Sequence, residues 1–478
     1  YFDNMDYKEL GFKAGIEIHQ QLSGKKLFCD CPADNVKYES DRKVERYLRA
    51  VVGETGEVDV AAAHETSKMK KFIYEANSKQ TCNIEFDEEP PKNVNLGHLK
   101  TAILVSKMLN AKIVDEVQVM RKIVVDGSNV SGFQRTMLVG YDGYIETEKG
   151  KVVVTLILLE EEAAQKIEAG EDFVKYNLAR LGIPLLEIST DASIKDAEHA
   201  KEVAAHIGMV LRSTEKVKRG IGTIRQDVNV SIKGGCRTEV KGFQDLKSIP
   251  KVIHNEIDRQ LGMIEDAVEL KEEVRKAEPD FSTTFLRPIP GAARLYPETD
   301  CLPITITKEM IDEIEIPELI SEKIEKLMET YNISDVLANG LAKSGIKFCE
   351  YVKEFKNLEP KTIGQILIDM PKDIKSRLNI DTSSLNEDNF KEALTKLNKD
   401  EISKDSIVDV LALMATGKEV DYSKFEKADL GDVEERIKKI VDEKPGLNAG
   451  GYMGLVMAEF KGQVDGATAM KILNKILK

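Results

Sequence analysis

Carboxylates and one imidazole recur in stretches of this sequence that have the alternating pattern of β-strands. Ile16 and Ile18 alternate with Glu17 and His19, so the two polar side chains share one face of a predicted strand. Acidic oxygens gathered from separate strands are the ligands that Mg²⁺ prefers, with water completing its shell. We therefore expect a cluster that binds a hard cation, formed by Glu17, His19, Glu161 and Glu187.

Two other members of this predicted cluster come from apolar runs. A strand-like segment that begins at Val152 ends in three consecutive glutamates, from Glu160 to Glu162. Glu187 follows a Gly-Ile-Pro turn and lies between Leu186 and Ile188, where a carboxylate needs a partner if its face is buried. The alternatives are an exposed Glu and His on a sheet surface and three acids that start a helix, where Glu is favoured.

The segment 223–241 predicts a β-hairpin with one charged face. Its first arm places Ile224, Gln226, Val228, Val230 and Ile232 on one face and Arg225, Asp227, Asn229 and Ser231 on the other. A turn at 233–235 leads to a second arm that carries Arg237, Glu239 and Lys241 on a common face. Such a face is typical of a charged ligand's binding site, although a solvated sheet with cross-strand ion pairs has the same pattern.

The segment 285–303 is rich in proline, which fixes the path of a chain. Polar groups, among them Arg294, alternate along it. We interpret it as one wall of the site. Between it and the hairpin, we expect a helix from Pro250 to Leu270 that continues through Glu273.

Composition limits the class of protein. With 478 residues the chain is too long for one core, and 42% hydrophobic and 32% charged residues favour a globular protein with several domains. No run approaches the apolar length that a bilayer requires. The residues before Met5 lack the pattern of a signal peptide; we expect a natural start at Met5 and a cytoplasmic protein. A net charge of −14 excludes a generally basic nucleic-acid binder but allows a local basic patch.

Six cysteines in a chain of this length argue against a disulfide framework. Cys29 and Cys31 have the spacing of half of a thiolate metal site, and Cys82 is the one other cysteine nearby in the sequence. Because structural zinc normally has four protein ligands, the sequence favours buried or free thiols.

From Lys308 onward, charged amphipathic segments such as 319–331 and 389–397 replace the strand pattern. We expect an α+β domain over 1–308, an all-α domain over 309–403 and a helical tail domain over 404–478. Lys461, Lys471, Lys475 and Lys478 in the tail have the charge to contact phosphates, and a solvated helix face explains them as well.

Five motifs together carry a family resemblance along almost the whole chain. They lie at 13–22 (Lys-Ala-Gly-Ile-Glu-Ile-His-Gln-Gln-Leu), 120–136, 182–188 (Gly-Ile-Pro-Leu-Leu-Glu-Ile), 224–231 (Ile-Arg-Gln-Asp-Val-Asn-Val-Ser) and 287–300. The sequence resembles the E subunit of archaeal glutamyl-tRNA(Gln) amidotransferase, in the GatB/GatE family. The resemblance implies a cradle domain of the glutamine synthetase type with an antiparallel sheet, then a helical domain and a tail domain that engages tRNA.

The resemblance also implies a reaction. ATP phosphorylates the γ-carboxylate of glutamate esterified to tRNA(Gln), and ammonia then displaces phosphate to give glutaminyl-tRNA. Glu17, His19, Glu161 and Glu187 would be catalytic through Mg²⁺, and Glu160 would contact a second, weaker ion. ATP and the acyl phosphate would lie against Arg225, Asp227, Asn229, Ser231, Arg237, Glu239, Lys241 and Arg294. Lys461, Lys471 and Lys475 would contact tRNA.

The resemblance further implies partners. No amidase nucleophile pattern is evident, so ammonia would come from an asparaginase-like D subunit through an internal channel, in a heterotetramer with two copies of each subunit. The sequence departs from the family where an insertion similar to part of bacterial aspartyl-tRNA synthetase is expected, because the chain passes directly from Glu273 to Val274. Two alternatives remain: a bacterial-type B subunit that also acts on Asp-tRNA(Asn), and a non-catalytic scaffold that binds tRNA.

Overall fold

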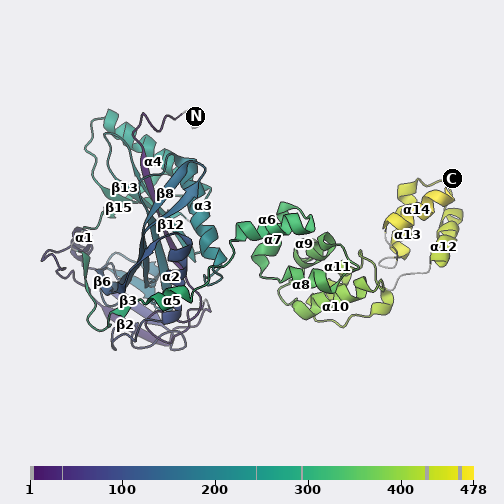
Figure 1. Cartoon of the computed structure of the whole chain (residues 1–478), viewed down its shortest axis with the longest axis horizontal. Helices are drawn as coiled ribbons and strands as arrows, with labels where there is room; N and C mark the ends of the chain where they lie inside the picture. The colour runs from purple at the N-terminus through teal and green to yellow at the C-terminus, as the bar shows by residue number, and fades with distance from the viewer. Residues whose placement is uncertain are drawn as a thin grey trace. The chain divides into compact units, whose positions relative to one another are not determined.

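The computed structural model describes residues 5–34, 36–243, 245–291, 294–425, 430–460, 464 and 466–477. The chain divides into two compact units, Tyr1–Leu319 and Ile320–Lys478. The first combines sheets with helices and the second consists of helices in its described part (Figure 1). The α+β class expected from the sequence is confirmed. The glutamine synthetase type of cradle and the division into three domains stay predictions.

An eleven-stranded sheet forms the centre of the first unit. Its strands follow the order β15-β14-β13-β12-β1-β11-β8-β7-β6-β16, and β4 pairs with β7. Neighbouring strands are antiparallel except β13 and β14, which are parallel. The strands are β1 (Lys13–Gln21), β4 (Lys112–Ile113), β6 (Val119–Ile123), β7 (Phe133–Thr147), β8 (Gly150–Glu161), β11 (Pro184–Thr190), β12 (Ile224–Ser231), β13 (Thr238–Phe243), β14 (Glu273–Ala277), β15 (Thr283–Pro288) and β16 (Leu295–Pro297).

One face of this sheet is covered by the helices α2 (Leu96–Met108), α3 (Ala197–Ser213) and α4 (Ser248–Glu265). In Figure 1, α3 and α4 run along one side of the strands. Ile16, Ile18 and Val228 point into the core on this side and are at most 1% exposed. Because successive side chains of a strand alternate, the polar residues between them lie on the opposite face, which these helices leave open.

The hairpin β12–β13 forms as its alternation predicts. Val228, Val230 and Val240 are fully buried, and Gly234 in the connecting turn has a φ of +79°, which favours glycine. Arg225 and Lys241 lie on the other face. The expected helix over 250–270 is shorter than the sequence suggests: α4 ends at Glu265, Ala267 has a φ of +54°, and Glu273 already belongs to β14.

Smaller elements complete the first unit. A four-stranded sheet, in the order β2-β3-β10-β9, has a separate core around Tyr74 and Tyr176. The remaining pair is β17-β5. These elements are β2 (Arg42–Arg46), β3 (Lys71–Ala76), β5 (Glu116–Val117), β9 (Gln165–Ala169), β10 (Phe173–Asn177), β17 (Ile304–Thr305), α1 (Val60–Ser67) and α5 (Lys308–Asp312).

The second unit is helical, as the amphipathic segments predict. Its helices are α6 (Ile320–Tyr331), α7 (Asp335–Ser344), α8 (Phe348–Glu354), α9 (Pro360–Leu378), α10 (Glu387–Asn398), α11 (Ile407–Ala415), α12 (Leu430–Glu443), α13 (Ala449–Glu459) and α14 (Gly466–Ile476). The last three share a core of their own, around Val433, Val456 and Leu473. Among the described residues, no helix has both the length and the apolarity needed to cross a bilayer.

Candidate active site

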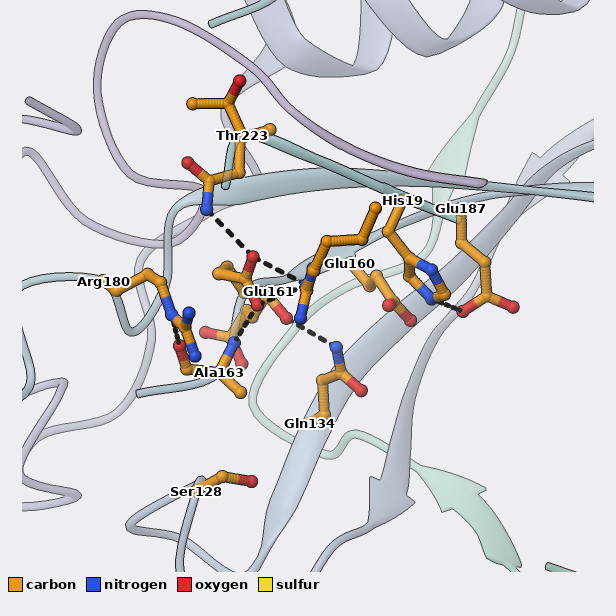
Figure 2. Close-up of polar contacts among 12 residues, drawn as sticks. His19, Ser128, Gln134, Glu160, Glu161, Ala163, Arg180, Glu187 and Thr223 are labelled. Carbon is orange, nitrogen blue, oxygen red and sulfur yellow. Dashed lines mark hydrogen bonds and ion pairs between the residues drawn. The ribbon is translucent and has the colours of Figure 1, made fainter. Parts of the chain in front are cut away.

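The open face of the central sheet gathers acidic side chains from adjacent strands. In the register, His19 of β1 lies opposite Glu187 of β11, and Glu160 of β8 lies opposite Leu185 of β11. Donor atoms of His19, Glu160 and Glu187 all lie within 4.8 Å of one another, and so do those of Glu17, His19 and Asp227. Figure 2 shows His19 and Glu187 pointing toward one another, with 3.3 Å between Nε2 and Oε2. We call these five residues the acidic cluster.

Glu161 lies apart from the acidic cluster, in contrast to our expectation. It follows Glu160 in β8, and neighbouring side chains of a strand point to opposite faces. Its carboxylate instead accepts hydrogen bonds from Arg135, with an Nη1–Oε1 distance of 3.3 Å, and is buried. Glu160 occupies the place in the cluster that we expected for Glu161.

Two lysines balance the charge of the acidic cluster, and sequence reasoning missed one of them. The Nζ atom of Lys122, in β6, lies 2.7 Å from Glu160 and 3.5 Å from Glu187. Lys241 lies 2.7 Å from Asp227 and 4.0 Å from Glu17. The alternation of β6 could have revealed Lys122, but nothing in the sequence pairs that strand with β8 through β7.

The pKa values of the acidic cluster are shifted by burial and by the charges of neighbouring members. Burial, reinforced by the charge of Glu187, raises the pKa of Glu17 to about 7. Burial would lower the pKa of His19, but the hydrogen bond and charge of Glu187 outweigh it and raise that pKa to about 9. Burial opposes ionisation of Glu187 too, yet Lys122 and His19 hold its pKa well below the usual value. A cluster this crowded with charge has the electrostatic character of a functional site.

The acidic cluster borders a cavity of about 620 Å³. Of the nucleotide-binding candidates, Arg225, Arg237, Glu239, Lys241 and Arg294 line it. Asp227 belongs to the acidic cluster. Asn229 accepts a hydrogen bond from Arg237 at 3.1 Å. Ser231 lies opposite Lys13 near the start of β1, about 13 Å along the strand from Asp227, and is not part of the lining.

Arg225 is already engaged by a buried carboxylate. Its Nη2 atom lies 2.8 Å from both carboxylate oxygens of Glu162, and Gln21 donates a further hydrogen bond to Glu162 at 2.9 Å. Burial opposes ionisation of Glu162, but Arg225 and Arg180 lower its pKa below the usual value. This pair therefore forms a fixed part of the cavity wall.

Arg287 also lines the cavity, and sequence reasoning missed it. It lies at the end of β15, near Arg294 of the proline-rich segment. Arg294 Nε donates to the carbonyl oxygen of Ile123 at 3.1 Å. The expectation that the segment 285–303 forms a wall of the site agrees with this placement; Ala292 and Ala293 lie outside the described residues.

A second group of potential ligands lies elsewhere in the first unit. Cys29, Cys31, Cys82 and Glu85 have donor atoms within 4.8 Å of one another. Cys29 Sγ lies 3.0 Å from Glu85 Oε1, and Lys26 Nζ lies 3.1 Å from the same oxygen. The sequence favoured free thiols because a fourth ligand was not evident. A carboxylate three residues after Cys82 supplies a fourth donor.

The lysines proposed for tRNA lie in or near the last helix. Lys471 and Lys475 are exposed on α14, and Lys475 Nζ lies 3.1 Å from Glu434 of α12. Lys461 and Lys478 lie outside the described residues. Part of the charge of Lys475 is thus compensated within the protein.

The donor set of the acidic cluster suits a hard divalent cation. Four carboxylates and one imidazole converge from four strands, and they face a cavity large enough for a nucleotide-sized ligand.

Comparison with known proteins shows which family has a catalytic domain of this kind. The model of the GatB/GatE catalytic domain matches residues 12–312, which include every member of the cluster. This chain belongs to the GatB/GatE family.

Curated members of the GatB/GatE family align with the chain over its length. The E subunit of glutamyl-tRNA(Gln) amidotransferase from Methanocaldococcus jannaschii is 36% identical, with 99% of each chain covered. The proteins of the same name from Methanosarcina barkeri and Archaeoglobus fulgidus are 36% and 35% identical, covering 98% and 99% of their own lengths. A GatB domain model also matches residues 347–477, in the helical unit.

This member of the family is shorter than these relatives. The alignment with the M. jannaschii protein runs over 627 positions, whereas the present chain has 478 residues, so about 150 positions have no counterpart here. The position expected for the insertion, between Glu273 and Val274, lies at the start of β14, which a loop of seven residues, 266–272, joins to α4.

Proposed function

We propose that this chain is the subunit of a tRNA-dependent amidotransferase that uses ATP to activate the γ-carboxylate of Glu-tRNA(Gln) for amidation. The observation that carries this proposal is the acidic cluster at the edge of a nucleotide-sized cavity, within a chain that aligns along its length with E subunits. A carboxylate is a poor acyl donor, and a phosphorylated one loses phosphate readily to an attacking amine. Positioning and charge neutralisation are what the protein must supply for the phosphoryl transfer.

The residues of the cavity divide these tasks. Glu17, His19, Glu160, Glu187 and Asp227 would hold Mg²⁺. When bound, the metal would supply positive charge at the transferring phosphoryl group. Lys122 and Lys241 offset the charge of Glu160 and Asp227 and orient these two carboxylates through contacts of 2.7 Å. Arg237 and Arg294 line the cavity, and their guanidinium groups would donate to phosphate oxygens in a forked geometry.

The remaining expectations are part of the same proposal. Ammonia comes from an asparaginase-like D subunit through an internal channel, in a complex with two copies of each subunit. The helical unit engages tRNA(Gln). Lys471 and Lys475 are the candidate phosphate contacts among the residues that the structure describes. The architecture is a cradle of the glutamine synthetase type followed by a helical and a tail domain, in a cytoplasmic enzyme.

Activity with free ammonium separates the proposal from its alternatives. The full chain, purified with its partner, should convert Glu-tRNA(Gln) to Gln-tRNA(Gln) in the presence of ammonium and Mg-ATP, with ATP consumed in proportion. Bound tRNA without ATP turnover would favour a scaffold. A co-purifying amidase of the Ser-Ser-Lys type, together with activity on Asp-tRNA(Asn), would favour a bacterial-type B subunit.

A further inference from the structure

A side pocket adjoins the large cavity. It has a volume of about 150 Å³ and shares Gln134, Ala163, Arg287 and Arg294 with the large cavity. Its other walls come from α1, from the residue before α1, and from residues between 123 and 129. A pocket below the roughly 300 Å³ at which sites for drug-sized ligands begin suits a group of amino-acid size. One ligand can therefore extend from the large cavity into the side pocket.

The side pocket carries both signs of charge. Asp59, Glu65 and Asp126 line it together with Arg287 and Arg294. Burial and the charge of Arg287 lower the pKa of Arg294, whereas the charges of Asp59 and of two members of the acidic cluster raise it. This guanidinium group therefore lies between the side pocket and the acidic cluster. The acids of the pocket would repel a ligand with negative charge alone, but they would attract one that has a positive charge at its far end.

Asp126 is the acid of the side pocket that is best placed for a cationic group. Glu65 is paired with Lys68 at 2.6 Å, and Asp59 is buried as the N-cap of α1. Asp126 is exposed, and its carboxylate accepts hydrogen bonds from the backbone N–H and the hydroxyl group of Ser128, at 2.9 and 2.6 Å. These neutral donors orient the carboxylate without cancelling its charge.

The turn that carries Asp126 is held by the core of the four-stranded sheet. Tyr176 donates to the carbonyl oxygen of Asp126, and Tyr74 donates to that of Gly127, each at 2.8 Å. Gly127 has a φ of +91°, and a Cβ atom at this position would lie 2.2 Å from the ring of Phe72. The turn therefore requires glycine, and its backbone has a fixed position on the wall of the side pocket.

Asn129 supplies an independent sign that the side pocket receives a ligand. It is 2% exposed and lines the pocket, and its Nδ2 atom has no hydrogen-bond partner among the residues that the structure describes. Buried N–H groups are nearly always paired in proteins. An acceptor oxygen on a ligand in the side pocket would complete this pairing.

We propose that the side pocket holds the glutamyl group of Glu-tRNA(Gln), with its γ-carboxylate at Arg287 and Arg294 and its α-ammonium group at Asp126. A glutamyl ester has opposite charges at these two ends, and its carbonyl oxygen can accept from Asn129. The γ-carboxylate then lies at the boundary with the large cavity, where Arg294 contacts both this carboxylate and the phosphoryl group that it receives. This inference rests on the proposed function and adds to it the residues that recognise the amino acid.

The substitution Asp126→Asn tests the contact with the ammonium group. Asparagine has nearly the same shape and forms the same kind of turn with Ser128, so the fold should be kept. In the full chain with its partner, the KM for Glu-tRNA(Gln) should rise about tenfold, because a charge-assisted contact is lost. The affinity for Mg-ATP by calorimetry, and for uncharged tRNA(Gln) in a filter assay, should equal that of the wild type. Asp172→Asn, at an exposed aspartate outside both cavities, is the matched control and should change none of these values.

A substrate without the ammonium group gives the complementary measurement. The ester of tRNA(Gln) with 2-hydroxyglutarate has a neutral hydroxyl group in its place and keeps the γ-carboxylate. The wild type should prefer Glu-tRNA(Gln) over this ester about tenfold in kcat/KM, whereas Asp126→Asn should not distinguish the two. A general disturbance of the fold would lower both rates together and leave their ratio as in the wild type.

Three results would overturn the proposal: no preference between the two esters in the wild type, an unchanged preference in Asp126→Asn, or a loss of affinity for uncharged tRNA(Gln) as large as the rise in KM. The last would place Asp126 against the tRNA itself. Failure of the proposed function is distinct, because the wild type would then form no Gln-tRNA from Glu-tRNA(Gln), ammonium and Mg-ATP.

Discussion

Side-chain direction within β8 decides which acid belongs to the site. Glu160 contacts Lys122 and lies within 4.8 Å of His19 and Glu187, whereas Glu161 contacts Arg135 on the opposite face. The two residues have the same chemistry and adjacent positions. Their difference in role follows from the period of two residues in a strand.

Substitution of these neighbours tests that difference. Glu160→Gln removes a charged ligand and should weaken Mn²⁺ binding, measured by electron paramagnetic resonance, by at least about tenfold. It should also abolish ATP-dependent Gln-tRNA formation while tRNA affinity in a filter-binding assay stays near that of the wild type. Glu161→Gln is the matched control and should retain Mn²⁺ binding. Loss of Mn²⁺ binding in Glu161→Gln alone would restore the role predicted for that residue from its sequence context.

The residue types of the site could be predicted from the sequence, but their partners could not. Alternation in β1 predicted that Glu17 and His19 share a face, and the structure places both in the acidic cluster. The choice between Glu160 and Glu161 required the position where β8 begins to pair with β11, which no local pattern gives. Lys122 and Arg287 were missed because each reaches the site through strand pairing distant in sequence.

At the scale of elements, a buried carboxylate attaches the proline-rich segment to the sheet. The Glu298 side chain is fully buried between Arg121 of β6, at 2.5 Å, and Arg135 of β7, at 2.8 Å. Burial opposes ionisation of Glu298, but the two arginines lower its pKa below the usual value. This contact holds the segment that carries Arg294 against the strands of the site.

Glu298→Gln should therefore destabilise the first unit. Removal of the shared carboxylate leaves the charges of Arg135 and Arg121 only partly compensated, by Glu161 and Asp300, which costs about 3 kcal/mol in the free energy of unfolding. Because the folded-state pKa of Glu298 is lowered, its contribution is present above the unfolded pKa of about 4.3 and is lost as pH falls further. Urea unfolding should show a large difference from wild type at pH 7 and a smaller one below pH 4.

Asp300→Asn is the control for this pair. Asp300 lies 3.4 Å from the same Arg121, but its side chain is 48% exposed, so its removal should cost less than about 1 kcal/mol. Equal effects of the two substitutions at pH 7 would contradict the role assigned to the buried carboxylate.

The group formed by three cysteines and Glu85 leads us to predict that the protein contains zinc. Four donors that converge within 4.8 Å match the number of ligands at a structural zinc site. Protein purified without chelators should contain about one zinc per chain by plasma emission spectrometry. Cys82→Ser should lower that content and the melting temperature, because the metal stabilises the folded state. Cys349→Ser, at an exposed cysteine of the second unit, should change neither. Wild-type protein free of zinc would support the thiol interpretation made from the sequence.

At the scale of elements, periodic segments were predicted well and their ends were not. The hairpin β12–β13 and the helices α6 and α10 agree with the pattern of their residues. The helix α4 was extended too far because the charged residues after Glu265 suit a helix surface as well as a loop. The sequence analysis considered Cys29, Cys31 and Cys82 together but missed Glu85 as the fourth donor, because a single glutamate three residues after a cysteine has no pattern that marks it as a ligand.

At the scale of the molecule, the two units divide the expected tasks. Every residue of the acidic cluster lies in the first unit, and the GatB domain match lies in the second. Both units are present in this chain, although about 150 positions of its alignment with the M. jannaschii relative have no counterpart here.

Removal of the last three helices should separate tRNA binding from ATP binding. A cut before Leu430 is preferable to one at residue 404, because α11 packs against α9 and α10 while α12–α14 have their own core. The shortened chain should bind tRNA at least about tenfold more weakly in a salt-matched filter assay, since phosphate contacts are lost. Its affinity for Mg-ATP by calorimetry should equal that of the full chain. Unchanged tRNA affinity would contradict a role for the tail.

The position of β1 has a consequence for biosynthesis. This strand leaves the ribosome before both of its neighbours, β11 and β12, which begin at Pro184 and Ile224. The apolar face of β1 therefore stays uncovered, and the strand unpaired, while some two hundred further residues are translated. Nascent chains of this protein are therefore expected to depend on chaperones, and amino-terminal fragments that stop short of β12 should aggregate rather than bind metal or nucleotide.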